Sequence, residues 1–236
     1  MRVRGARSAA RIVVAVSVMA LALVGCSSSS TPPTSTAAPP PAAADLIATS
    51  ATAMKAVTSA HFTITVTGTL PDLTVQSADG DLTGTGDAKG TAKINQLGQL
   101  VEVEFVVVAK DLYLKGPTGG FTKLPAALAG AVYDPTAILN PDKGVAKVLT
   151  GATGLSPTTE SGSNYVVTGT VPKDIAAGLT PGISTDVAGT FTIDKATSQV
   201  ASVAFGAKGS DGKDAKVELA LSDYNKAVTV TAPPSS

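Results

Sequence analysis

Residues 61–68 read HFTITVTG, and the period of this stretch decides the fold. Apolar side chains alternate with threonines along it, so one face of the segment is apolar and the other is polar. An alternation of two is typical of a β-strand that buries one face. Residues 101–108, VEVEFVVV, repeat the pattern, with Glu102 and Glu104 on the polar face. The two stretches therefore predict a sheet with a single apolar face.

Turn signals divide the region 61–115 into about four or five antiparallel strands. Glycine and aspartate, which favour turns, cluster near Asp79–Asp81, Gly98 and Lys110–Asp111. The stretch GTGDAKGT at 84–91 predicts a hairpin, because a phosphate loop would need Gly-Lys-Ser/Thr at the start of a helix. Further strands are expected near 164–171, 187–194, 199–207 and 215–222.

Helices are predicted before and between the two groups of strands. Residues 45–60 have apolar side chains at helical spacing, and Asp45 is placed to cap the first turn. Asp134-Pro135 and Asn140-Pro141 each put a capping side chain before a proline at the first helical position, and Gly151 is placed to end the second of these helices. Helices on the apolar face of an antiparallel sheet define an α+β fold.

Two short segments nearly repeat: VTGTLP at 66–71 and VTGTVP at 167–172. The match indicates either that a unit of a helix and strands occurs twice or that common strand residues coincide by chance. Six positions do not separate these two interpretations.

The N-terminus has the pattern of a secretory signal peptide over residues 1–25. Four arginines precede an uncharged run, 12–25, that is shorter than the ~17–25 residues of a membrane-spanning helix. The exit, Leu23-Val24-Gly25-Cys26, resembles a bacterial lipobox, which implies cleavage before Cys26 and a lipid on its thiol. The alternatives are an uncleaved anchor, or an ordinary signal followed by an incidental cysteine.

The signal predicts an exported protein, held by its lipid anchor on the outer face of the plasma membrane in the cell envelope. Residues 26–44 form the lipidated cysteine and a Ser/Thr/Pro/Ala linker without charge before Asp45. As a flexible coil such a linker spans roughly 20–25 Å. Residues 45–232 are then expected to form one domain. A linker docked on that domain is the alternative.

Composition excludes several classes of function. After residue 25 the chain carries 14 lysines against 18 acids and has no basic stripe, which argues against nucleic-acid binding. Aromatic residues make up 4% of the chain and tryptophan is absent, so the interior is expected to be aliphatic. Cys26 has no partner for a disulfide and His61 is the only histidine, so we expect no metal site and no cofactor.

The sequence offers little support for catalysis. His61 is the obvious base for serine hydrolysis, but no nucleophile motif lies near it, and a structural or surface histidine is the simpler interpretation. Glu102 and Glu104 are better explained as solvent-facing acids of one strand than as a catalytic pair. We therefore expect a protein that is not an enzyme.

Residues 59–75, 105–113, 133–149 and 221–234 together resemble the mycobacterial LppX/LprA/LprF/LprG lipoproteins. The segment YDPTAILNPDKGVAKVL is the most specific of the four, and Tyr224 stands where these proteins often have tryptophan. The resemblance implies a half-barrel, in which a strongly curved antiparallel sheet wraps over helices and encloses an apolar cavity.

The resemblance also implies a function. A protein of this kind binds acylated lipids, such as glycolipid, phospholipid or triacylglycerol, and carries them from the plasma membrane towards the outer envelope. Likeness to LprG further implies a major-facilitator membrane transporter as a partner. The alternative is a surface lipoprotein with a solid core that acts as an envelope interaction or sensing module, and bound lipid would distinguish the two.

The expected lining of the cavity comes from the apolar strand face and from the middle helices, with ordinary core packing as the alternative for each residue. These residues are Ile64, Val66, Ala92, Ile94, Val103, Phe105, Val107, Ile138, Leu139, Val145, Val148 and Leu149.

Overall fold

The computed structural model describes residues 39–71, 73–124, 134–209 and 211–234. Every helix, strand and core residue among them lies within Pro39–Ser236, which forms one compact unit. The described core residues therefore all belong to one unit. The predicted signal peptide, Cys26 and residues 27–38 of the predicted linker lie outside the described residues.

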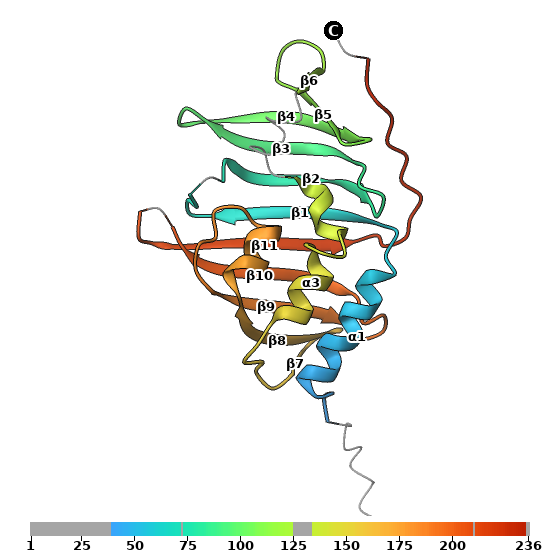
Figure 1. Cartoon of the computed structure of the whole chain (residues 1–236), viewed down its shortest axis with the longest axis vertical. Coiled ribbons are helices and arrows are strands. Elements are labelled where there is room, and N and C mark those ends of the chain that lie inside the picture. Colours follow the sequence, from blue (N-terminus) through green and yellow to red (C-terminus); the bar gives the residue numbers. More distant parts are fainter. Residues whose placement is uncertain (1–38, 72, 125–133, 210, 235–236) are drawn as a thin grey trace, which may run out of the picture. The chain divides into compact units, whose positions relative to one another are not determined.

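An antiparallel sheet of eleven strands dominates the described part of the chain, in the order β6-β5-β4-β3-β2-β1-β11-β10-β9-β8-β7 (Figure 1). The central pair, β1 and β11, joins the first and last strands in sequence. The sheet stays open, with β6 and β7 as its edges. The strands are β1 (Ser59–Thr67), β2 (Val75–Thr83), β3 (Ala88–Gln96), β4 (Gln99–Val108), β5 (Asp111–Lys115), β6 (Thr122–Leu124), β7 (Thr159–Ser161), β8 (Asn164–Val171), β9 (Val187–Asp194), β10 (Val200–Lys208) and β11 (Asp214–Ser222).

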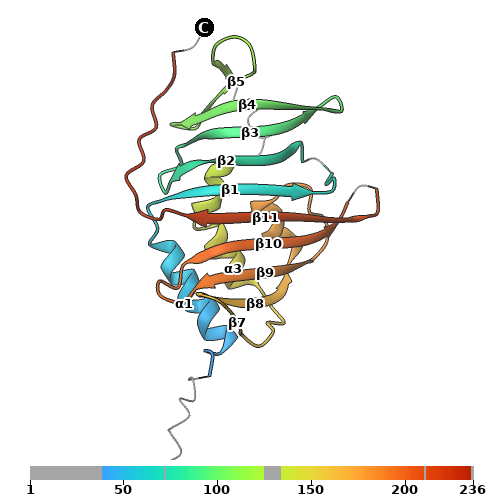
Figure 2. The same cartoon turned by 180° about the vertical axis from the view of Figure 1, so that it is seen from behind.

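The helices lie on one face of this curved sheet, as the front and back views agree (Figures 1 and 2). They are α1 (Ala43–Lys55), the 3₁₀-helix η1 (Pro135–Leu139), α3 (Val145–Gly151) and α4 (Lys173–Leu179). Helix α3 packs against α1, η1 and α4. The predicted α+β fold, with a curved open sheet over helices, is confirmed.

The strand predictions hold closely because the apolar alternation is local. The region 61–115 holds five strands, at the upper end of the predicted number, and GTGDAKGT forms the β2–β3 hairpin. The four later strands match their predicted ranges within one residue at each end. The turn predicted at Asp79–Asp81 is wrong, since these residues lie inside β2. Gly80 is required instead by the close approach of β3 to β2.

The helix starts are less accurate. Helix α1 begins at Ala43, so Asp45 lies in its first turn and makes no capping hydrogen bond. Asp134 does cap a helix, since its carboxylate accepts from the Thr136 amide at 3.0 Å, but the helix is 3₁₀. Asn140 begins no helix: it ends η1, and its Oδ1 accepts from the amide of Asp142 at 2.9 Å, while α3 begins only at Val145. Helix α4 was not predicted.

The two near-repeats adopt different conformations. In the first, β1 ends at Thr67, and Gly68 follows with a φ of +83°. In the second, Gly169 lies inside β8 and is paired with Gly189. Strand β1 is central and β8 is next to the edge strand, so the two segments do not occupy matching places in the sheet.

One row across the sheet joins two phenylalanines through two glycines. The register aligns Phe62 of β1 with Gly80 of β2, Gly90 of β3 and Phe105 of β4. A β-carbon at Gly80 would lie 2.3 Å from the Lys89 carbonyl oxygen, and one at Gly90 would lie 2.1 Å from that of Asp79. Only glycine therefore fits at these positions, and the two phenylalanine rings meet with centroids 6.4 Å apart.

Replacing Gly90→Ala is expected to lower the free energy of unfolding by about 1–3 kcal/mol, because the added methyl forces two backbones apart. Gly206→Ala is the matched control, since Gly206 also lies in a strand and a β-carbon there would meet nothing within 4 Å. Urea unfolding of both variants measures the difference. Equal stability of the two variants would contradict this explanation of the glycine pair.

Candidate functional site

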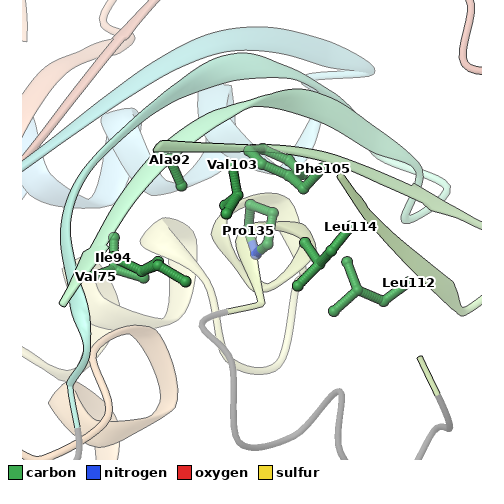
Figure 3. Close-up of a pocket in the computed structure, with 8 residues that line it drawn as sticks. All are labelled: Val75, Ala92, Ile94, Val103, Phe105, Leu112, Leu114 and Pro135. Atoms are coloured by element: carbon green, nitrogen blue, oxygen red, sulfur yellow. The ribbon is translucent and has the colours of Figure 1, made fainter. Parts of the chain in front are cut away.

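An apolar pocket lies between the inner face of strands β2 to β5 and the start of η1 (Figure 3). Its cavity volume is about 30 Å³, so the enclosed space between the walls is narrow. Figure 3 shows Val103 and Phe105 on the sheet above Pro135, with Val75 and Ile94 at one end and Leu112 and Leu114 at the other. The lining residues are Val75, Ala92, Ile94, Val103, Phe105, Leu112, Leu114 and Pro135.

The alternation of the strands builds the wall of this pocket. Ala92 pairs with Val103 across β3 and β4, so both side chains point to the same face of the sheet. Phe105 pairs with Leu114 of β5 in the same way. Ala92 pairs with Ala78 on its other side, so two short side chains lie next to each other in this row and leave space that a leucine or isoleucine would fill.

The floor is set by the capped start of η1. The Asp134 carboxylate accepts hydrogen bonds from both the amide and the hydroxyl of Thr136, at 3.0 and 2.7 Å. This cap fixes Pro135 at the first helical position, beneath the sheet. Every described side chain of the lining is a hydrocarbon, so this part of the site favours apolar groups.

The structure brings together four of the residues predicted to line a cavity: Ala92, Ile94, Val103 and Phe105. The other eight lie in or against the same core without lining this pocket. Seven of them are buried: Ile64, Val66, Val107, Ile138, Val145, Val148 and Leu149. Leu139 is partly buried against that core.

Four lining residues were not predicted. Leu112 and Leu114 alternate with polar residues in DLYLK, the same signal that identified β4, on a strand of five residues. Val75 pairs with Ile94 at the start of β2. Pro135 was interpreted as a helix start, which it is, and its ring also faces the pocket. The alternation of β5 could have identified two of the four.

His61 lies on the opposite, outer face of the sheet, where its side chain is 32% exposed. Its Nδ1 is 3.0 Å from an oxygen of Asp81, and its Nε2 is 3.3 Å from one of Asp79. Partial desolvation lowers the pKa of His61, but the hydrogen bond with Asp81 and the charges of both aspartates outweigh it, so the pKa is raised above 6.5. This environment stabilises the imidazolium form, as in a structural ion pair.

The two glutamates also have a simple structural role. Glu102 and Glu104 are exposed on the outer face of β4, as predicted. Glu104 accepts a hydrogen bond from the ammonium of Lys115 at 2.7 Å, which links β4 to β5. These acids therefore belong to the solvated surface of the sheet.

His61→Gln is expected to destabilise the folded chain more at about pH 5.5 than at about pH 8.5. A histidine whose pKa is raised on folding stabilises fully below its unfolded pKa of about 6.5, and this contribution is lost as pH rises through the folded value. Urea unfolding of both chains at the two pH values measures it. Equal losses at both would show that the aspartates do not stabilise the imidazolium, and the double change Asp79→Asn with Asp81→Asn should abolish the difference.

The sheet, its helices and the pocket define a class of protein: an open half-barrel with an apolar site between sheet and helices. Residues 42–230 match the family described as the LppX_LprAFG lipoproteins. The chain belongs to this family, as the resemblance predicted.

Named relatives agree with this assignment. The chain is 35% identical over 226 residues to a protein of Mycobacteroides abscessus named lipoarabinomannan carrier protein LprG, with 92% of this chain and 94% of the relative covered. It is 31% identical over 234 residues to the protein of the same name from Mycobacterium tuberculosis, with 95% of each covered.

Two crystal structures share the fold. LprF from Mycobacterium bovis superposes with a TM-score of 0.69 at 23% identity, covering 84% of this chain and 99% of LprF. LppX from Mycobacterium tuberculosis gives a TM-score of 0.60 at 23% identity, covering 80% of this chain and 98% of LppX. Within the described ranges, none of the helices has the length and apolar character needed to cross a bilayer.

Proposed function

We propose that this chain is a membrane-anchored lipid carrier without catalytic activity. The apolar pocket under β2 to β5 carries the proposal, because an all-hydrocarbon lining selects acyl chains over polar molecules. Each CH₂ group buried there contributes ~0.8 kcal/mol. The relatives named as lipoarabinomannan carriers support a lipid or glycolipid as cargo.

The cavity volume of about 30 Å³ has room for only a few atoms of an acyl chain. It is well below the ~300–1,000 Å³ typical of small-ligand sites. An acyl cargo therefore requires the walls to part, and η1 is the wall that can give way, since this 3₁₀-helix has only five residues and, among the described residues, contributes Pro135 to the lining. Glycolipid, phospholipid and triacylglycerol are all compatible with such a site.

Lipid binding has a direct test in Ala92→Trp. The indole would occupy the pocket that Ala92 lines, so bound lipid should fall about tenfold or more, the loss expected when about two CH₂ groups lose their contacts. Thr91→Trp is the matched control, since its neighbouring position on β3 faces outwards. Native mass spectrometry and solvent extraction of residues 27–236 from an actinobacterial host measure the cargo, and circular dichroism checks folding.

Three outcomes separate the candidates. Lipid in the wild type and Thr91→Trp but not in Ala92→Trp supports the carrier and its pocket. Lipid retained by a folded Ala92→Trp places the cargo elsewhere. A wild type that is free of lipid and takes up no added acyl lipid favours the interaction or sensing module with a solid core.

The anchor is proposed at Cys26, with residues 1–25 removed from the mature chain. Two or more acyl chains hold a protein stably on a membrane where one does not. The linker then leaves the half-barrel free at the outer face of the plasma membrane, from which cargo is transferred towards the outer envelope. A major-facilitator transporter in the same membrane is the proposed partner that supplies the cargo.

Lipidation predicts that isotope-labelled palmitate enters the wild-type chain and not Cys26→Ala. The variant lacks the thiol that is alkylated, so it should also keep residues 1–25 or be cut at another position. Gel analysis of labelled cells, with intact mass of the purified chain, measures both effects. Label that persists in Cys26→Ala would overturn this site of attachment.

A further inference from the structure

The tip of the β3–β4 hairpin carries two exposed leucines. Leu97 is fully exposed, at 101% of its reference area, and Leu100 is 63% exposed. Among the described residues, these two are the large apolar side chains that stand out into solvent. Both lie within four residues of each other, on the hairpin that joins β3 to β4 (Figures 1 and 2).

The geometry of the turn does not explain Leu97. Gln96 pairs with Gln99, so Leu97 and Gly98 are the two central residues, with φ values of +52° and +85°. Such turns favour Asn-Gly or Asp-Gly, because both central residues adopt a left-handed conformation. Leucine here is unfavourable both in backbone conformation and in exposure. Asn95 holds the tip in place by accepting a hydrogen bond from the Gly98 amide at 2.9 Å.

The tip is also uncharged. Residues 94–101 read INQLGQLV, and the nearest charged residues along the two strands, Lys93 and Glu102, occupy opposite positions in the register. Asparagine and glutamine flank the leucines, so the tip offers apolar side chains surrounded by neutral hydrogen-bonding groups. Such a surface suits the boundary between the acyl chains and the headgroups of a bilayer.

The tip lies close to one end of the pocket. Ile94, three residues before Leu97, lines the pocket and pairs with Val101 on β4. Val75, at the same end of the pocket, pairs with Ile94 on its other side (Figure 3). The next pair towards the tip on this face, Gln96 with Gln99, is polar, so the exposed leucines lie near this end of the pocket but are not part of its lining.

We propose that the β3–β4 tip is a lipid-surface contact: Leu97 and Leu100 insert into the outer boundary of a bilayer and bring the Val75–Ile94 end of the pocket against it. The purpose of this contact would be to load or release cargo, so that purpose depends on the proposed carrier function. The insertion itself depends only on the leucines.

A bilayer fits the tip better than a protein partner does. A stable protein interface buries about 800 Å² on each partner, which is far more than two side chains on one turn provide. Insertion into lipid is non-directional and needs no matching surface. Two leucines give weak, reversible contact, which suits a protein already tethered to the same membrane.

The absence of tryptophan from the sequence allows a direct test. Leu97→Trp makes the tip the site of the single indole of the chain, so residues 27–236, which lack the predicted anchor, can be used. Mixing with phosphatidylcholine vesicles should shift its emission to shorter wavelength, and brominated acyl chains should quench it. Thr85→Trp, on the exposed β2–β3 turn, is the control and should show neither effect.

A second variant tests the natural leucines. Leu97→Asn with Leu100→Thr keeps residues that suit the turn and the strand, so the chain should fold. Flotation with phosphatidylcholine vesicles should fall at least tenfold relative to the wild type, while lipid that co-purifies in the pocket should remain. Transfer of a fluorescent phospholipid between vesicles should slow by a similar factor.

Each failure has a separate meaning. Unshifted emission of Leu97→Trp on vesicles, or equal flotation of the double variant, overturns the lipid-surface contact even if the pocket holds lipid. A shift that needs no vesicles and grows with protein concentration also overturns it, in favour of a second copy of the chain at the tip. Vesicle insertion with a pocket that takes up no lipid leaves the contact standing and overturns the carrier function.

Discussion

Phe62 and Phe105 lie on strands that have two others between them, yet their ring centroids are 6.4 Å apart. At a strand spacing of about 4.8 Å, β1 and β4 are about 14 Å apart in a flat sheet. The rings meet because the row between them consists of Gly80 and Gly90, which have no side chains, on the concave face. The curve of this half of the sheet and the place of Phe105, which also lines the pocket, depend on that contact.

The two halves of the sheet differ in how completely side chains fill the space on their inner face. The half formed by β7 to β11 is filled, with Phe191 and Ile193 of β9 and Val200 and Phe205 of β10 all 2% exposed or less. On β3 the inward positions carry Ala88, Gly90 and Ala92 instead. Small residues there leave the space that becomes the pocket. The hollow is therefore a property of β3 and its neighbours, while α1 and α3 cover a solid core.

The sequence predicts best what depends on neighbours along the chain. Strand β9 was predicted at its observed bounds, because alternation requires no knowledge of the partner strand. The sequence predicts Gly80 in a turn. In the structure a glycine is required there because β3 approaches closely, and β3 lies nearby only after folding. Asn140 is a residue type that often begins a helix, but here it ends η1. The residue type alone does not show whether the helix follows it or precedes it.

The same limit applies to the site. Alternation placed Ala92 and Val103 on the inner face, but it could not distinguish them from Ile64 or Val107, which face the same way and lie in packed core. Whether an inward residue lines space or fills it depends on the size of residues on other strands and on the position of η1. That information is spread over four strands and a helix and is absent from any single stretch.

Strands β3 and β4 combine two features that would conflict in an ordinary domain. Their inner face carries small and aliphatic residues that leave space, and their tip exposes leucines that a solvated turn would replace by asparagine. A dry cavity loses contacts, and an exposed leucine loses favourable burial. Lipid removes both losses at once, by filling the pocket with an acyl chain and by covering the tip with a bilayer. One hairpin thus supplies a wall for the cargo and a contact with its source.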